Sequence, residues 1–86
     1  MDNSNSKLVI MHNDDKTPVD FVNAILIGVF DKTKEESSII SNNIHLHGAM
    51  PVGKFSSKDA NSKVEQVMLT AQKYSLPFKC EAVSVH

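Results

Sequence analysis

The segment Asn13-Asp14-Asp15 carries the most distinctive chemistry of the sequence, because it places one amide beside two carboxylates. An amide oxygen and a carboxylate held together can accept the hydrogen bonds of an ammonium group, which has three donors and no acceptor. The same residue types also form turns by bonding to their own backbone. The segment therefore predicts either a simple turn or a polar clamp for an amine.

His45 is the second candidate for a hydrogen-bond acceptor. Its ring accepts when it is neutral and loses this capacity on protonation, although a lone helical histidine can equally be an exposed residue without a ligand. Ser37 and Ser41 precede it at intervals of four, which places the three side chains on one helix face. Ser41 is a poor core residue there unless it lines a cavity or meets solvent.

Enzymatic and metal chemistry find no support in the sequence. His12, His45 and His47 lack a recognisable metal-ligand spacing, and no GxSxG or phosphate-binding loop pattern occurs. Cys80 lies in an apolar, strand-like segment, where a buried thiol is expected rather than a nucleophile. We therefore expect no enzyme activity, no catalytic residue, no metal and no cofactor.

Composition excludes further classes of protein. The 86 residues allow one compact domain with a surface pocket rather than an engulfing cavity. Nine basic residues, none of them Arg, stand against ten acidic ones, which argues against nucleic-acid binding. The single cysteine, the polar start and the lack of an apolar run of about 18–20 residues predict a soluble protein without a membrane partner. Its expected location is cytoplasmic in a bacterium, or the plastid stroma if organellar.

The first half of the chain divides into a strand and two helices. The apolar run 8–11 indicates a strand. Thr17-Pro18 fits the N-cap and first position of a helix. Apolar residues follow at helical spacing: Val19, Val22, Ile25, Leu26, Val29 and Phe30. Thr33-Lys34-Glu35-Glu36 has the form of a capping box, and the helix that it starts should run to Gly48. Its expected apolar residues are Ile39, Ile40 and Ile44.

The second half predicts a strand, a helix and a strand. Residues 49–55 include Pro51 and Gly53, so a strand there is short, irregular or at an edge. Ser56 or Ser57 caps the third helix, whose expected apolar stripe comprises Ala60, Val64, Val67, Met68 and Ala71. Alternation from residue 78 onward predicts the last strand.

The element order β-α-α-β-α-β predicts an α+β fold, with three helices packed on a small three-stranded antiparallel sheet. Residues 1–6 are small and polar, which predicts a disordered N-terminal tail. Residues 7–86 form the single domain, which we expect to be a monomer.

Residues 12–22 read HNDDKTPVDFV, and this string resembles the signature of the ClpS family of ATP-dependent Clp protease adaptors, where NDD, a variable residue, TP and FV recur. An ungapped register extends the resemblance over about residues 7–81. It includes Ile44, His45, Gly48, Gly53, Phe55, Ala60, Lys63, Val64, Val67, Pro77 and Cys80. The family's fold has the same element order, so residues 7–86 are interpreted as a ClpS-like adaptor domain.

The resemblance implies a non-catalytic N-end rule adaptor. Such a protein binds N-degron substrates by their free α-amino group and their first side chain, Leu, Phe, Tyr or Trp, and delivers them to a Clp AAA+ ATPase. By register, Asn13, Asp14 and His45 would bind the amino group. The hydrophobic pocket of the family falls on Thr17, Val19, Val22, Ser41, Ile44 and Phe78.

Some positions depart from the family pattern. Val19 and Ser41 stand where bacterial members often carry methionine, which predicts a differently shaped, wider pocket with altered preference and tolerance of Ile or Val. The surface that the family uses to dock on the N-terminal domain of the ATPase falls on Lys58, Asn61 and Lys63. Only Lys63 matches, because the other two stand at positions that are often acidic.

Two alternative functions stay open. The tail of about six residues is shorter than in many members, which favours a binding-only variant that docks on the protease and blocks or redirects delivery. The C-terminal domain of the ribosomal stalk protein shares this kind of fold, so a translation-associated protein is the alternative from another class. That alternative predicts a different loop in place of residues 13–15.

Overall fold

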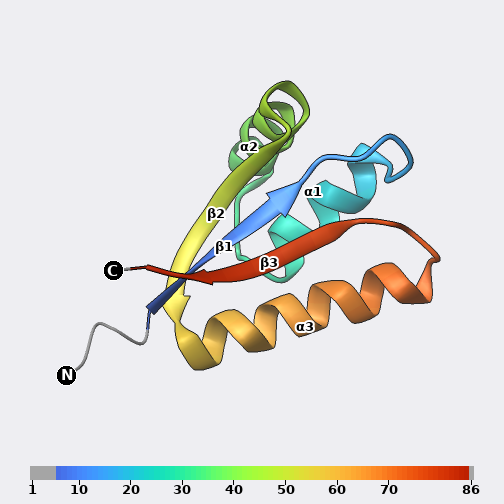
Figure 1. Ribbon diagram of the computed structural model, residues 1–86. Coiled ribbons are helices and arrows are strands. Elements are labelled where there is room, and N and C mark those ends of the chain that lie inside the picture. The colour runs from blue at the N-terminus through green and yellow to red at the C-terminus, as the bar shows by residue number, and fades with distance from the viewer. Residues whose placement is uncertain (1–5, 86) are drawn as a thin grey trace.

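The computed structural model describes residues 6–85 and confirms the predicted α+β fold. The strands are β1 (Ser6–His12), β2 (Ala49–Ser56) and β3 (Lys79–Ser84), and the helices are α1 (Val19–Gly28), α2 (Lys34–His47) and α3 (Ser57–Lys73). The sheet is antiparallel in the order β2-β1-β3, so β1 is central (Figure 1). None of these helices is long and apolar enough to cross a membrane.

The start of β1 corrects one predicted boundary. We expected the N-terminal tail to include residue 6, but Ser6 belongs to β1 and pairs with Ser56 of β2. Its carbonyl oxygen also accepts a hydrogen bond from the backbone N–H of Val85, at 3.4 Å. Backbone pairing on both sides draws this polar residue into the sheet. The rest of the predicted tail, residues 1–5, lies outside the described residues.

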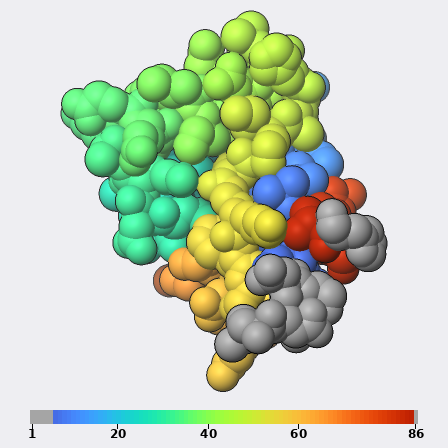
Figure 2. Space-filling view, turned by 90° about the vertical axis from the view of Figure 1, so that its left-hand side faces the viewer, coloured from blue at the N-terminus to red at the C-terminus, as the bar shows by residue number. Residues whose placement is uncertain are grey.

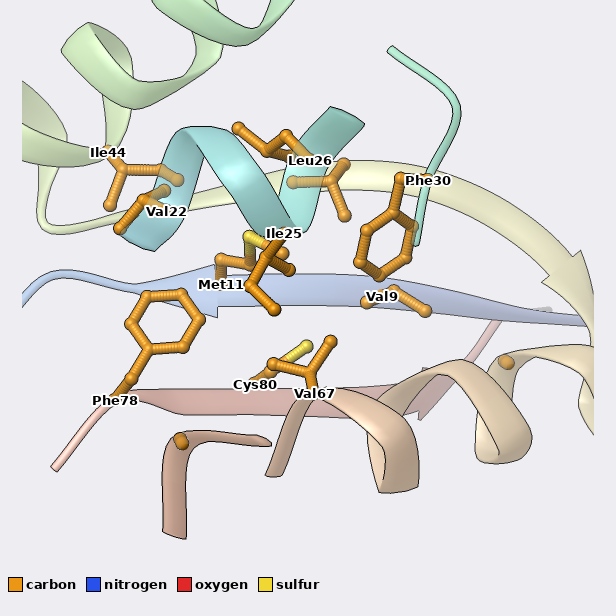
Figure 3. Close-up of a cluster of buried hydrophobic side chains, with 13 residues drawn as sticks. Val9, Met11, Val22, Ile25, Leu26, Phe30, Ile44, Val67, Phe78 and Cys80 are labelled. Atoms are coloured by element: carbon orange, nitrogen blue, oxygen red, sulfur yellow. The ribbon is translucent and has the colours of Figure 1, made fainter. Parts of the chain in front are cut away.

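The core lies between one face of the sheet and the helices. Alternate residues Val9 and Met11 of β1 are fully buried, because successive side chains of a strand point to opposite faces. Figure 3 shows α1 on one side of these residues, with Val67 of α3 and Cys80 of β3 on the other. The helices therefore enclose one continuous core, whose two ends lie near Phe30 and Phe78.

The beginning of α1 differs from the prediction. Pro18, and not Thr17, occupies the N-cap, with an extended backbone (φ −64°, ψ 146°) and no side-chain cap. The Thr17 hydroxyl is turned back to Asp14 instead, to which it donates a hydrogen bond of 2.7 Å. A hydrogen bond to a charged carboxylate is about twice as strong as a neutral one, which favours this orientation of the hydroxyl over one that caps the neutral backbone N–H groups of α1. The helix consequently starts one residue later than a Thr17 cap would place it.

Both predicted ends of α2 are confirmed, as are the burial of Ile44 and the packing of Ile40 against the core, but the third expected position differs. Thr33 and Glu36 form the reciprocal capping box, and Gly48 ends the helix in the left-handed conformation (φ 84°). Ile39, which we expected on the buried face, is 63% exposed, and the side chains of Ser37 and Ser41 are buried in its place. These serines are buried because a polar partner on α1 receives their hydroxyl hydrogens, as described below.

The segment from β2 to α3 follows the expected pattern with one exception in each element. β2 is an edge strand with a register shift opposite Val9 and Ile10, although its eight residues make it longer than expected. Figure 2 shows this strand exposed along the surface, with α2 above it. Ser56 caps α3 by accepting from the Asp59 N–H at 3.1 Å. Met68, which we expected in the apolar stripe of α3, is 37% exposed.

Candidate functional site

The loop between β1 and α1 is organised by the carboxylate of Asp14. One of its oxygens, Oδ1, accepts from the backbone N–H groups of Lys16 (2.8 Å) and Thr17 (2.7 Å). The other, Oδ2, accepts from the Thr17 hydroxyl. Asp14 therefore makes the turn that the sequence predicted as its simpler interpretation.

The same hydrogen bonds favour the ionised form of Asp14. Partial burial raises the pKa of this carboxyl, but the hydrogen bonds from the Thr17 hydroxyl and from the two backbone N–H groups outweigh burial and lower it below its usual value. The side chain is thus an oriented carboxylate at neutral pH. Oδ2 accepts one hydrogen bond, so it retains a lone pair for a further donor.

Asn13 is brought to the end of α2 by its backbone. Its N–H donates to the carbonyl oxygen of Gly48, at 2.9 Å, which joins the loop after β1 to the C-terminus of α2. Its side chain is exposed and makes no hydrogen bond within residues 6–85, and His45, in the last turn of α2, is also exposed. Asn13, Asp14 and His45 all line the same pocket.

The pocket is an open hollow of about 600 Å³ between this loop, α1, α2 and the start of β3. All nine residues predicted for the amine site and the hydrophobic pocket line it: Asn13, Asp14, Thr17, Val19, Val22, Ser41, Ile44, His45 and Phe78. Val22, Ile44 and Phe78 are buried and lie together at one end of the core (Figure 3), whereas Val19 is 58% exposed. The pocket therefore joins hydrogen-bond acceptors to a deep apolar wall.

Asn23 is the main pocket residue that the sequence analysis missed. Its Oδ1 accepts from the hydroxyls of Ser37 (3.0 Å) and Ser41 (2.6 Å), so it is the partner that allows these serines to be buried between α1 and α2. A signal was present in the sequence. Asn23 stands four residues after Val19 and three before Leu26, so it interrupts the apolar stripe of α1 with an amide.

His12 also lines the pocket and was not predicted to do so. Its Nε2 lies 2.5 Å from a carboxylate oxygen of Glu81, a residue of the neighbouring strand β3. The two residues come together only in the sheet, since 69 positions separate them in the chain. Within residues 6–85, no group of three or more His, Cys, Asp or Glu side chains is arranged to hold a metal ion.

The three residues predicted to dock on the ATPase lie on α3, outside the pocket, and do not share one surface. Lys58 and Asn61 are exposed and three residues apart, hence neighbours on the helix. Lys63 is half-buried, and its ammonium donates to the Val29 carbonyl at 2.9 Å and lies over the ring of Phe55. Lys63 therefore stabilises the packing of α3 against the loop that follows α1.

The fold and the pocket together define a small binding module. Cys80, the single cysteine of the chain, is buried, and burial, assisted by the charge of Glu81, raises the pKa of its thiol to about 12. A thiol in this state is a poor nucleophile. The pocket is suited to recognition, because it combines the oriented carboxylate of Asp14 with apolar side chains.

Comparison with known proteins identifies the family to which this module belongs. Residues 3–81 match the model of the family "ATP-dependent Clp protease adaptor protein ClpS", so the chain belongs to the ClpS family of non-catalytic Clp protease adaptors. The chain is 38% identical over 77 residues to the ClpS adaptor of Treponema denticola and 40% identical over 72 residues to ClpS 1 of Rhizobium meliloti. These alignments cover 90% and 84% of this chain, and 76% and 62% of the respective relatives.

A solved structure supports the fold independently. The chain superposes on Agrobacterium tumefaciens ClpS2, solved with bound L-phenylalaninamide, with a TM-score of 0.91. The superposition covers 96% of this chain and all of that one, at 20% sequence identity. At this identity the likeness establishes the fold, and the ligand is a property of the Agrobacterium protein.

Proposed function

We propose that this protein binds the free N-terminus of N-degron proteins that begin with Leu, Phe, Tyr or Trp, and delivers them to a Clp-type AAA+ ATPase. The observation that carries the proposal is the union, in one pocket, of Asn13, the charged Asp14 and His45 with a buried apolar wall. An α-amino group and a hydrophobic first side chain need these two surfaces side by side. The L-phenylalaninamide bound by Agrobacterium ClpS2 has this combination of groups.

The energetics favour binding without catalysis. Hydrogen bonds that involve a charged group contribute about 1.5–3 kcal/mol each, and burial of a Leu or Phe side chain contributes roughly 1.5–3 kcal/mol. After the cost of association, such contributions are consistent with affinities on the order of micromolar. An acetylated or internal residue lacks the charged ammonium, so it leaves the carboxylate of Asp14 without its partner.

The proposed partner surface is the N-terminal half of α3, with Lys58 and Asn61 as its exposed residues. Lys63 contributes to it through the packing that it makes with Val29 and Phe55. The ATPase domain that docks there is the N-terminal domain of the Clp ATPase. The proposed setting is the bacterial cytoplasm, because the relatives found by comparison are bacterial.

Fluorescence anisotropy with labelled peptides that differ only in residue one tests the binding step. We expect peptides with N-terminal Phe, Leu, Tyr and Trp to bind, and acetylation or Asn13→Ala to reduce affinity at least tenfold. An Ile peptide tests the predicted widening at Val19 and Ser41, and its rejection would show that idea to be wrong. If none of the peptides binds, the pocket does not recognise N-degrons.

A degradation assay with a Clp ATPase–protease and a reporter that begins with Phe tests delivery. We expect the protein to accelerate turnover of the reporter, and Lys58→Ala, which removes an exposed side chain of the proposed docking surface, to reduce the acceleration without changing peptide affinity. If the protein binds peptides but slows turnover, it blocks or redirects delivery, and the delivery part of the proposal is wrong.

A further inference from the structure

The wall of the pocket between α1 and α2 contains a small buried polar network. Asn23 of α1 accepts from both serine hydroxyls of α2 through a single atom, Oδ1, at 3.0 Å from Ser37 and 2.6 Å from Ser41. Ser37 and Ser41 are 1% and 6% exposed, so the network is held inside the protein. Asn23 and Ser41 both line the pocket.

This network fixes which way the amide of Asn23 points. A carbonyl oxygen has two lone pairs, and the two hydroxyls occupy both. The Nδ2 group therefore lies on the other side of the amide, with two N–H donors that bond to no side chain or backbone oxygen within residues 6–85. No buried side-chain nitrogen or oxygen of the described residues lacks a partner, so this nitrogen is accessible, and Asn23 reaches solvent in the pocket.

The position of the donor suits the tip of a long side chain. Ser41 precedes His45 by one turn of α2, so the network lies about 5–6 Å along the helix from the histidine at the rim. If the amino group of a substrate binds at the rim, as the proposed function has it, the first side chain would extend past Ile44 in this direction. An aromatic ring spans this distance, whereas a Leu side chain is shorter.

We propose that Asn23 is a specificity residue that makes the pocket favour Tyr over Phe as the first residue of a substrate. This inference rests on the proposed function, because it assumes that the amino group binds at the rim. The phenol oxygen of Tyr accepts a hydrogen bond from Nδ2. Phe displaces water from this donor and has no acceptor to replace it. Sites built to hydrogen-bond a substrate hydroxyl discriminate strongly against the analogue that lacks it. Since this pocket is open, we expect a moderate ratio, about tenfold.

The test compares the affinities of two peptides that are identical except for Tyr or Phe at the first position. We expect the wild-type protein to bind the Tyr peptide about tenfold more tightly. Asn23→Leu should bring the ratio close to one, both by weakening Tyr and by strengthening Phe. Asn43→Leu is the matched control, because Asn43 lies on α2 outside the pocket, and it should keep the wild-type ratio.

The outcomes separate this inference from the proposed function. If both peptides bind the wild-type protein equally, or if Asn23→Leu keeps the Tyr preference, the role of Asn23 is wrong while N-degron binding stands. If neither peptide binds, the proposed function fails and this inference fails with it. Ser41→Ala provides a second variant that loosens the amide without removing it, and a fall in the Tyr/Phe ratio is expected there too.

Discussion

Asp14 serves two purposes that one substitution can separate. Its carboxylate makes the turn through the N–H groups of Lys16 and Thr17 and the Thr17 hydroxyl, and by the proposal it also accepts from the substrate's ammonium group. Asp14→Ala removes both roles. Asp14→Asn keeps an oxygen for the two backbone N–H groups, since Asn forms the same kind of turn, but it removes the negative charge.

The magnitudes follow from the exposure of the loop. Asp14 is half-buried, and the N–H groups that it leaves behind can bond to water, so Asp14→Ala should cost about 1–2 kcal/mol of unfolding free energy, as for loss of a helix cap. In a domain of this size, that corresponds to a fall in Tm of roughly 4–16 °C. Asp14→Asn should cost less than about 1 kcal/mol, yet weaken peptide binding at least tenfold, because hydrogen bonds to charged groups are the stronger ones.

Thermal unfolding and peptide anisotropy on the same samples measure both effects, with Asp15→Ala as the control for stability only, because Asp15 also lines the pocket. Asp15 lies in the same loop and its side chain makes no hydrogen bond within residues 6–85, so its loss should leave stability unchanged. The pKa of Asp14 is lowered in the fold, so its stabilising contribution is fully present above about pH 4 and disappears as the pH falls through the folded pKa. If Asp14→Asn binds peptides as the wild type does, Asp14 makes the turn and nothing more.

Three further perturbations test other parts of the reasoning. His45→Ala should weaken peptide binding because it removes the ring acceptor from the pocket, whereas His47→Ala should keep the wild-type affinity because His47 does not line the pocket; peptide anisotropy measures both. Gly48→Ala should cost about 1–2 kcal/mol of unfolding free energy, because Gly48 has a positive φ. Gly28→Ala, in α1 with open space around it, should be neutral or stabilising by up to about 1 kcal/mol. Denaturant melts of both variants measure these changes. Alkylation of Cys80, followed by mass spectrometry at pH 8, should be slow in the native protein and fast in urea, and rapid native labelling would contradict its burial and its pKa of about 12.

Local signals in the sequence predicted the elements well because each is decided by a few neighbouring residues. The capping box at Thr33 and Glu36 and the glycine after α2 depend on contacts within one turn of the chain, and both are found as predicted. The error at the start of α1 arises where two local signals compete for one side chain. Thr17 was expected to cap α1, but the carboxylate of Asp14 takes its hydroxyl, and no propensity scale includes that choice.

The site depends on both local and distant information. Asn13, Asp14 and His45 could be named from motif and register, but the hydrogen bond from Asn13 to Gly48 that joins them exists only in the folded chain. Hydrophobic patterning placed Ile39 in the core and gave no role to Asn23, because it assumes that a buried helix face is apolar. The amide oxygen of Asn23 accepts hydrogen bonds from two serine hydroxyls. Ser37 and Ser41 are therefore buried on this face of α2, and Ile39 faces solvent.

This reversal links the packing of the helices to the selectivity of the pocket. Substituting Asn23 by an apolar residue would leave two buried hydroxyls without their acceptor, so α1 and α2 can exchange this network for apolar packing only by changing all three positions together. The polar residues in this part of the pocket therefore also hold the interface between α1 and α2 together. If specificity here evolves, we expect Asn23, Ser37 and Ser41 to change as a set. Asn13 and Asp14 share no hydrogen bond with this network within residues 6–85, so they can stay constant while it changes.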